Sequence, residues 1–166
     1  IFGAGHVAQA VSNIAKTLRF NIALYDFRED ILNEFPGSQY DRKSLLDFSK
    51  LSVMDKEEII LDDKDFVLIM THNHIHDIEV LKFIYRNYPQ MNYIGMIGSR
   101  RKVYEAVTII KEHFGSSINL KNLYAPVGIN IGGDLPEEIA LSIMAEIQSN
   151  VYNRNQHHLR LDELNE

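Results

Sequence analysis

The sequence predicts an α/β domain built as a three-layer sandwich, in which a mainly parallel sheet lies between two layers of helices. Two observations lead to this fold class. Apolar runs typical of strands buried on both faces occur at residues 20–25, 66–70 and 93–97. Apolar residues at helical spacing recur over residues 7–18, 75–88, 103–114 and 139–151. Strands and helices that alternate along a chain form right-handed βαβ units and a parallel sheet.

The 166 residues fit a single domain, which we expect to span 1–153 and to be followed by a polar tail over 154–166. The hydrophobic fraction of 45% is enough for a complete core. Between the first two strand-like runs, the polar stretch of residues 27–65 shows no clear period. We expect one weak helix or strand there, without a defined position.

Composition excludes several classes of function. The 17 basic and 23 acidic side chains give a net charge of −6, which argues against a broad nucleic-acid surface. No apolar stretch reaches the roughly 20 residues needed to cross a bilayer. The chain contains no cysteine, so disulfides, thiolate metal sites and a cysteine nucleophile are excluded. A cytoplasmic location is compatible with these features and is the one we expect.

The chain begins at Ile1, and a glycine-rich turn follows after two residues. A strand usually needs about five or six residues. We therefore expect the first strand to be truncated and the chain to be a piece of a longer protein.

That glycine-rich turn, Gly3-x-Gly5-x-x-Ala8, lies between the end of a strand and the start of a helix. The pattern is typical of Rossmann-like dinucleotide-binding domains. The first glycine allows the tight turn, the second allows a pyrophosphate to approach, and the small third residue lets helix and strand pack closely. We include His6, inside the turn, among the candidate cofactor-binding residues.

An acidic residue follows the glycine turn at the expected distance. Asp26 comes 21 residues after Gly5, at the end of the second predicted strand, where an acid usually accepts a hydrogen bond from a ribose 2′-hydroxyl. Arg28 either accommodates an additional phosphate or is a solvated loop residue. These features predict a phosphate-bearing cofactor without selecting NAD over another nucleotide-like ligand.

Three histidines follow the strand at 66–70, in the segment Thr71-His72-Asn73-His74-Ile75-His76. Open α/β sheets bind ligands at the carboxyl ends of their strands, so we expect Thr71, His72 and His74 to contact the ligand. Alternatively, Thr71 or Asn73 caps the next helix while the imidazoles bond locally. A zinc site is not expected, because the helix separates the imidazoles and no cysteine is available.

The segment Gly98-Ser99-Arg100-Arg101-Lys102 places three cations in the first turn of a predicted helix, where the helix dipole disfavours positive charge. An anion bound by Ser99, the free N–H groups and an arginine would resolve this conflict. The alternative is a solvated basic helix start. We favour anion binding and take Gly98, Ser99, Arg100 and Arg101 as candidates.

A long glycine-containing loop, residues 125–135, precedes the last predicted helix. Gly128 and Gly132 either allow a ligand to approach the backbone or supply the positive φ values that turns require. Asp134 and Glu137 predict a capping box at the helix start, with Pro136 in the first turn.

Taken together, these segments resemble the Rossmann domain of the XdhC/CoxI family, the xanthine dehydrogenase accessory proteins. The resemblance spans about residues 1–150, and its most specific blocks are GSRRK at 98–102 and APVGINIGGDLPEEIALSIMAEI at 125–147. It implies a maturation factor that binds the molybdenum cofactor (molybdopterin), assists its sulfuration and delivers it to a molybdenum hydroxylase apoenzyme such as xanthine dehydrogenase. The family pattern does not require His76, so only His72 and His74 are carried over.

Two alternatives remain open. An NAD(P)-dependent oxidoreductase would use His72 or His74 as an acid or base, but the sequence has no Tyr-x-x-x-Lys pair. A nucleotide-sensing module would bind without chemistry. We expect a cofactor-binding protein, with no catalytic residue and no metal ligand assigned, and without nucleic-acid or membrane partners. A homodimer is compatible with the sequence.

Overall fold

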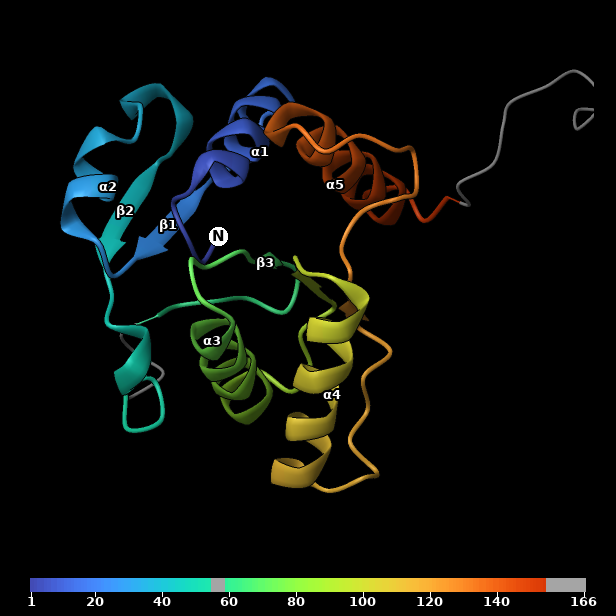
Figure 1. Ribbon diagram of the computed structural model, residues 1–166. Coiled ribbons are helices and arrows are strands. Elements are labelled where there is room, and N and C mark those ends of the chain that lie inside the picture. Colours follow the sequence, from blue (N-terminus) through green and yellow to red (C-terminus); the bar gives the residue numbers. More distant parts are fainter. Residues whose placement is uncertain (55–58, 155–166) are drawn as a thin grey trace, which may run out of the picture.

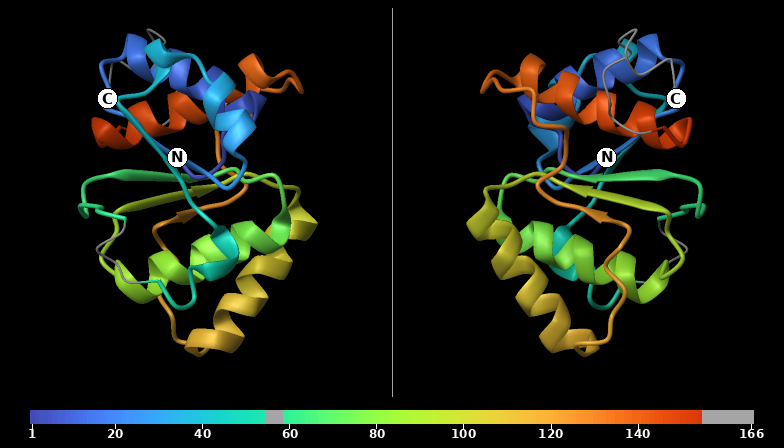
Figure 2. Two further views of the ribbon diagram at one scale, coloured as in Figure 1. Left: turned by 90° about the vertical axis from the view of Figure 1, so that its left-hand side faces the viewer. Right: turned by 90° about the vertical axis from the view of Figure 1, so that its right-hand side faces the viewer.

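A computed structural model describes residues 1–54 and 59–154 of the chain. It shows a parallel sheet covered on both faces by helices, as Figure 2 shows from two sides. Helices α1 (His6–Thr17) and α5 (Pro136–Val151) cover one face, while α3 (His74–Asn87) and α4 (Arg100–Phe114) cover the other. The predicted α/β fold class is confirmed.

The sheet consists of two groups of parallel strands joined by the first two residues of the chain. Strand β1 (Ala23–Asp26) pairs with β2 (Arg42–Leu45). The second group has the order β3 (Phe66–Ile69), β4 (Tyr93–Met96) and β5 (Leu123–Tyr124). Phe2 bridges both Tyr25 and Ile69 in parallel, so Ile1 and Phe2 occupy the position between β1 and β3.

Two clusters of buried side chains form the core, one on each face of the sheet. The α1 and α5 side contains Val11, Leu24, Leu68 and Ile143. The α3 and α4 side contains residues that alternate with these along the strands, together with helical ones: Tyr25, Val67, Ile69, Leu81 and Ile110. Because β1 and β3 contribute to both clusters, their sequences are almost wholly apolar.

The stretch between β1 and β3 holds more structure than the sequence predicted. It contains α2 (Glu29–Glu34), strand β2 and two 3-10 turns, Gly37–Gln39 and Phe48–Lys50. Strand β2 lies at the sheet edge with a mostly exposed sequence, RKSL. That exposure explains why apolar patterning did not reveal it.

Helix α5 begins differently from the prediction. Leu135 is the N-cap, and the carboxylate of Glu138 accepts the backbone N–H groups of Asp134 and Leu135 at 2.9 and 3.0 Å. The predicted capping box of Asp134 with Glu137 is therefore wrong. The helix starts one residue later because Pro136 occupies its first position, where a missing N–H costs nothing.

The predicted tail at 154–166 lies outside the described residues except for Arg154. None of the helices in the described part of the chain is both long and apolar enough to cross a membrane.

Candidate functional site

The glycine turn and the segments that follow β1, β3 and β4 lie at one edge of the sheet, because the carboxyl ends of parallel strands share an edge (Figure 1). Asp26 is the last residue of β1, Thr71 lies two residues after β3, and Gly98 lies two residues after β4. This edge is where open α/β sheets place their ligands.

The two glycines of the turn have different surroundings. Gly3 has a φ of +108°, and a Cβ there would lie 2.2 Å from the carbonyl oxygen of Met70, so only glycine fits. Gly5 is the N-cap of α1 in extended backbone, and a Cβ there would meet nothing within 4 Å. The open side of Gly5 is therefore available to a ligand.

The start of α1 has no side-chain cap. The first intrahelical hydrogen bond of the turn runs from the N–H of Gln9 to the carbonyl of Gly5, at 3.0 Å. The N–H groups of residues 6–8 precede it and are of the kind that receives an anion at a helix start. Ala8 is buried against the core, as expected for the small third residue of the motif.

Asp26 is fully buried and tied to the glycine turn. Its carboxylate accepts the Ala4 N–H at 2.7 Å, the Arg28 N–H at 3.0 Å, and the Arg28 Nε and Nη2 at 2.9 and 2.7 Å. Burial alone would raise the pKa of Asp26, but the hydrogen bonds from Arg28 and Ala4 outweigh it and lower the pKa. Asp26 therefore remains ionised inside the fold.

A cleft of about 390 Å³ opens beside the turn. It brings together three of the predicted cofactor-binding side chains, those of His6, Arg28 and His72, with Gly5 at its base. The remaining lining residues come from the turn, α1 and α2: Ala4, Gln9, Ile31, Glu34 and Phe35. The cleft therefore combines a helix start, a guanidinium and two imidazoles.

Thr71 connects the end of β3 to α3 through a buried acid. Its N–H and hydroxyl lie 3.0 and 2.6 Å from the Oδ1 of Asp77. Burial raises the pKa of Asp77, although hydrogen bonds from Thr71 and nearby cationic groups oppose the rise. The side chain of Asn73 accepts the N–H of Ile75 at 2.8 Å, so Asn73 is the cap of α3, one of the two alternatives that the sequence left open.

The three histidines of this segment lie in different surroundings. His72 is exposed in the cleft, whereas the Nε2 of His74 lies 3.7 Å from the carboxylate of Glu105 in α4. His76 packs edge-on against the rings of Phe27 and Phe48. Within residues 1–54 and 59–154, no three His, Asp or Glu side chains are grouped closely enough to hold a metal ion.

The basic helix start is present as predicted. Ser99 is the N-cap of α4 and its hydroxyl accepts the N–H of Lys102, while the first turn contains no acid. Arg100 and Arg101 are exposed, and no ion pair involves them in the described part of the chain. These residues and Gly98 do not line the cleft, so their predicted contact with a ligand stays a prediction.

The two loop glycines differ from each other. A Cβ at Gly128 would lie 2.3 Å from the Oγ of Ser142, which itself donates to the carbonyl of Ile129 at 2.6 Å. Gly128 therefore lets the loop pack on α5. Gly132 has a φ of +82° and open space around its Cα, so either interpretation of it remains open.

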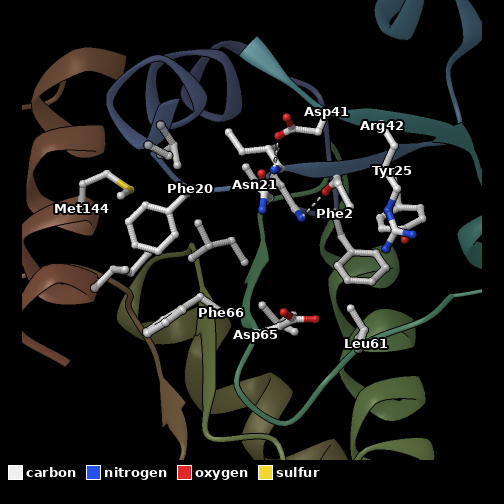
Figure 3. A pocket seen from close by; sticks show the side chains of 18 of the residues that line it. Phe2, Phe20, Asn21, Tyr25, Asp41, Arg42, Leu61, Asp65, Phe66 and Met144 are labelled. Carbon is white, nitrogen blue, oxygen red and sulfur yellow. Dashed lines mark hydrogen bonds between the residues drawn. The ribbon is translucent and has the colours of Figure 1, made fainter. Parts of the chain in front are cut away.

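A larger cavity of about 530 Å³ lies at the other end of β1 and β3, beyond Ile1 (Figure 3). Its walls are mainly apolar, with Phe20, Phe66 and Met144 among the lining side chains. Because it lies at the amino ends of the strands, it is separate from the glycine turn and from the residues predicted to bind a cofactor.

A family model described as the XdhC Rossmann domain matches residues 1–147. The chain belongs to this family. The resemblance inferred from the sequence blocks is confirmed, and so is the Rossmann fold.

Two relatives and one solved structure place this XdhC Rossmann domain among longer proteins. It is 35% identical to the uncharacterized protein YqeB of Escherichia coli over 89% of the chain and 26% of the relative. It is 27% identical to a probable xanthine dehydrogenase subunit of Bacillus subtilis, over 89% and 41%. A crystal structure of a xanthine dehydrogenase from Bacillus halodurans matches with a TM-score of 0.75 and 29% identity, over 93% and 42%.

The chain therefore spans from about a quarter to two fifths of the length of these proteins. The functions of the other parts of those proteins are not carried by the residues of this domain.

Sequence reasoning missed Asp77 as a candidate site residue of this XdhC domain. Asp77 is buried on the same helix face as Val80, Leu81 and Ile84. An acid at an apolar position of a helix is rarely buried without a partner, so this position was the available signal.

Proposed function

We propose that this XdhC Rossmann domain is the cofactor-binding part of a maturation factor for a molybdenum hydroxylase of the xanthine dehydrogenase type. It holds the molybdenum cofactor, or a related nucleotide, during sulfuration and insertion into the apoenzyme. The observation that carries the proposal is the cleft at the glycine turn, which combines the uncapped start of α1 with the guanidinium of Arg28.

The residues of the cleft fit a phosphate-bearing group. The open side of Gly5 leaves room for a phosphate next to the backbone, and the N–H groups at the start of α1 donate toward it. Arg28 adds a positive charge whose orientation is fixed by Asp26. His6 and His72 lie on the walls, where they orient the rest of the ligand.

In this role the domain binds and protects its ligand and does not transform it. When bound, the cofactor supplies the molybdenum centre that the hydroxylase uses. The domain's own residues hold the phosphate end in the cleft. The apoenzyme partner is proposed on the names of the B. subtilis relative and the B. halodurans structure, both of which refer to xanthine dehydrogenase.

The test uses the full-length protein that contains this chain. It is purified from cells that make the molybdenum cofactor, and its pterin content is measured by fluorescence after oxidation. We expect close to one pterin per protein, and loss of xanthine dehydrogenase activity when the gene is deleted. A protein without pterin, in cells whose hydroxylase stays active after the deletion, would contradict the proposal. Hydride transfer followed by NAD(P)H absorbance would instead support an oxidoreductase.

A further inference from the structure

The carboxylate of Asp26 is saturated with hydrogen bonds. Each carboxylate oxygen has two lone pairs. Oδ1 accepts the backbone N–H and the Nε of Arg28, and Oδ2 accepts the Ala4 N–H and the Nη2 of Arg28. All four donors lie within 3.0 Å, and the side chain has no exposed surface.

This saturation changes the role of the acid. In dinucleotide-binding domains, an acid at the end of this strand accepts a hydrogen bond from the ribose 2′-hydroxyl. Asp26 has neither an unused lone pair nor an exposed oxygen for such a hydroxyl. It is instead a positioning residue, which holds the glycine turn through Ala4 and fixes Arg28 side-on.

Arg28 keeps donors that face the cleft. A guanidinium has five N–H groups in a planar fork, and Asp26 uses one on Nε and one on Nη2. Within the described residues, Nη1 has no hydrogen-bond acceptor. The side chain is 23% exposed and lines the same cleft as His6, His72 and Gly5.

We infer that Arg28 determines specificity: the cleft selects a ligand carrying a phosphomonoester over the same ligand with a free hydroxyl. The end-on edge of the guanidinium, Nη1 with the remaining N–H of Nη2, matches two phosphate oxygens. The inference deepens the proposed function and rests on it in one respect, that the cleft is the cofactor site.

Glu34 sets the main counterforce. Its carboxylate also lines the cleft and is exposed, so it repels a dianionic phosphate through solvent. Replacing Glu34 with glutamine removes that charge while keeping the size of the side chain. Glu34→Gln should therefore strengthen binding of the phosphorylated ligand selectively.

Two matched ligand pairs supply the test, because the same phosphate chemistry occurs in two sources. One pair is NADP⁺ and NAD⁺, which differ only in the ribose 2′-phosphate. The other is the oxidised fluorescent derivative of molybdopterin, with its phosphate and after phosphatase treatment. Titration calorimetry or fluorescence on the full-length protein gives the four affinities.

In at least one pair, the phosphorylated member should bind about 10- to 100-fold more tightly, the range expected for charge-assisted hydrogen bonds. The pair that shows the difference identifies the source. Equal affinities within both pairs, or no binding by any of the four ligands, would overturn the inference. The wild-type comparison needs no variant and so does not depend on whether a variant folds.

Variants locate the effect. Arg28→Gln should reduce the phosphate advantage to about twofold or less, and Arg28→Lys should keep part of it as a point charge. Lys111→Ala, which removes an exposed cation near the end of α4, is the matched control and should change nothing. An advantage that survives in Arg28→Gln contradicts the assignment.

Failure of the inference differs from failure of the proposed function. The proposed function fails when the purified protein carries no pterin and the hydroxylase matures without it. The affinity ratio within each pair is measured independently of both observations.

Discussion

Asp26 and Arg28 form a side-on ion pair in which Nε donates to Oδ1 at 2.9 Å and Nη2 donates to Oδ2 at 2.7 Å. The same carboxylate holds the glycine turn through the N–H of Ala4. One buried charge therefore fixes both the phosphate-facing backbone and the cation of the cleft. This coupling makes the site sensitive to changes at Asp26.

Asp26→Asn should lower the free energy of unfolding by about 1–3 kcal/mol, because it weakens charged hydrogen bonds to a buried group. It should also change the response to acid. Since the pKa of Asp26 is lowered in the fold, its stabilising contribution is present above the usual value of 3.8 and lost as pH falls through the folded pKa.

Urea unfolding between neutral and strongly acidic pH measures this effect. The wild type should lose more stability over the acid range than Asp26→Asn does. Parallel curves for the two proteins would show that Asp26 is not held in its charged form.

Asp77 should show the opposite pH dependence. Burial raises its pKa in the fold, so its contribution is fully present below the unfolded value of 3.8 and is lost as pH rises through the folded pKa. Asp77→Asn keeps an acceptor for Thr71 without the buried charge. At neutral pH it should be as stable as the wild type, or more stable by at most about 1 kcal/mol.

Thermal unfolding of both proteins across mildly acidic to neutral pH provides the measurement. The wild type should lose stability relative to Asp77→Asn as pH rises. A large destabilisation of Asp77→Asn at neutral pH would mean that the charge itself is required.

The two turn glycines should respond differently to the same substitution. Gly3→Ala places a Cβ 2.2 Å from the Met70 oxygen at positive φ, so it should cost at least about 2 kcal/mol of stability. Gly5→Ala meets no neighbour and should change stability by less than about 0.5 kcal/mol. It should still weaken ligand binding about tenfold or more, because the methyl group occupies the side that a phosphate approaches.

Denaturant titration and calorimetry on the two variants separate these effects. Gly5→Ala with unchanged ligand affinity would argue that the ligand does not approach the turn.

Arg100→Glu tests the basic start of α4. The substitution places an acid in the first helical turn, so stability should rise by about 0.3–1 kcal/mol. We predict weaker binding of a phosphorylated cofactor with the fold intact, as seen by calorimetry and circular dichroism. Unchanged affinity would confine the ligand to the cleft and leave α4 outside the site.

The fold could be predicted where apolar patterning is strong. Strands β3 and β4 are nearly continuous apolar runs, and the helices after them have regular stripes, so their positions were predicted to within a few residues. Strand β2 and helix α2 could not be placed, because β2 is an exposed edge strand and α2 spans only six residues.

The site could be predicted residue by residue but not in its connections. Spacing from Gly5 identified Asp26, yet nothing in the sequence shows that Arg28 closes onto it from two residues away. That contact depends on the turn after β1 and on the Ala4 N–H, which comes from a distant part of the chain. Likewise, the burial of Asp77 depends on how α3 packs against the sheet.

The most direct test of the central claim is a crystal structure of the full-length protein purified with its native ligand. We predict density for a phosphate against the N–H groups of residues 6–8, with Arg28 within hydrogen-bond distance and His72 beside the ligand. A native ligand bound elsewhere in the protein, with its phosphate away from Gly5 and Arg28, would contradict the proposed site.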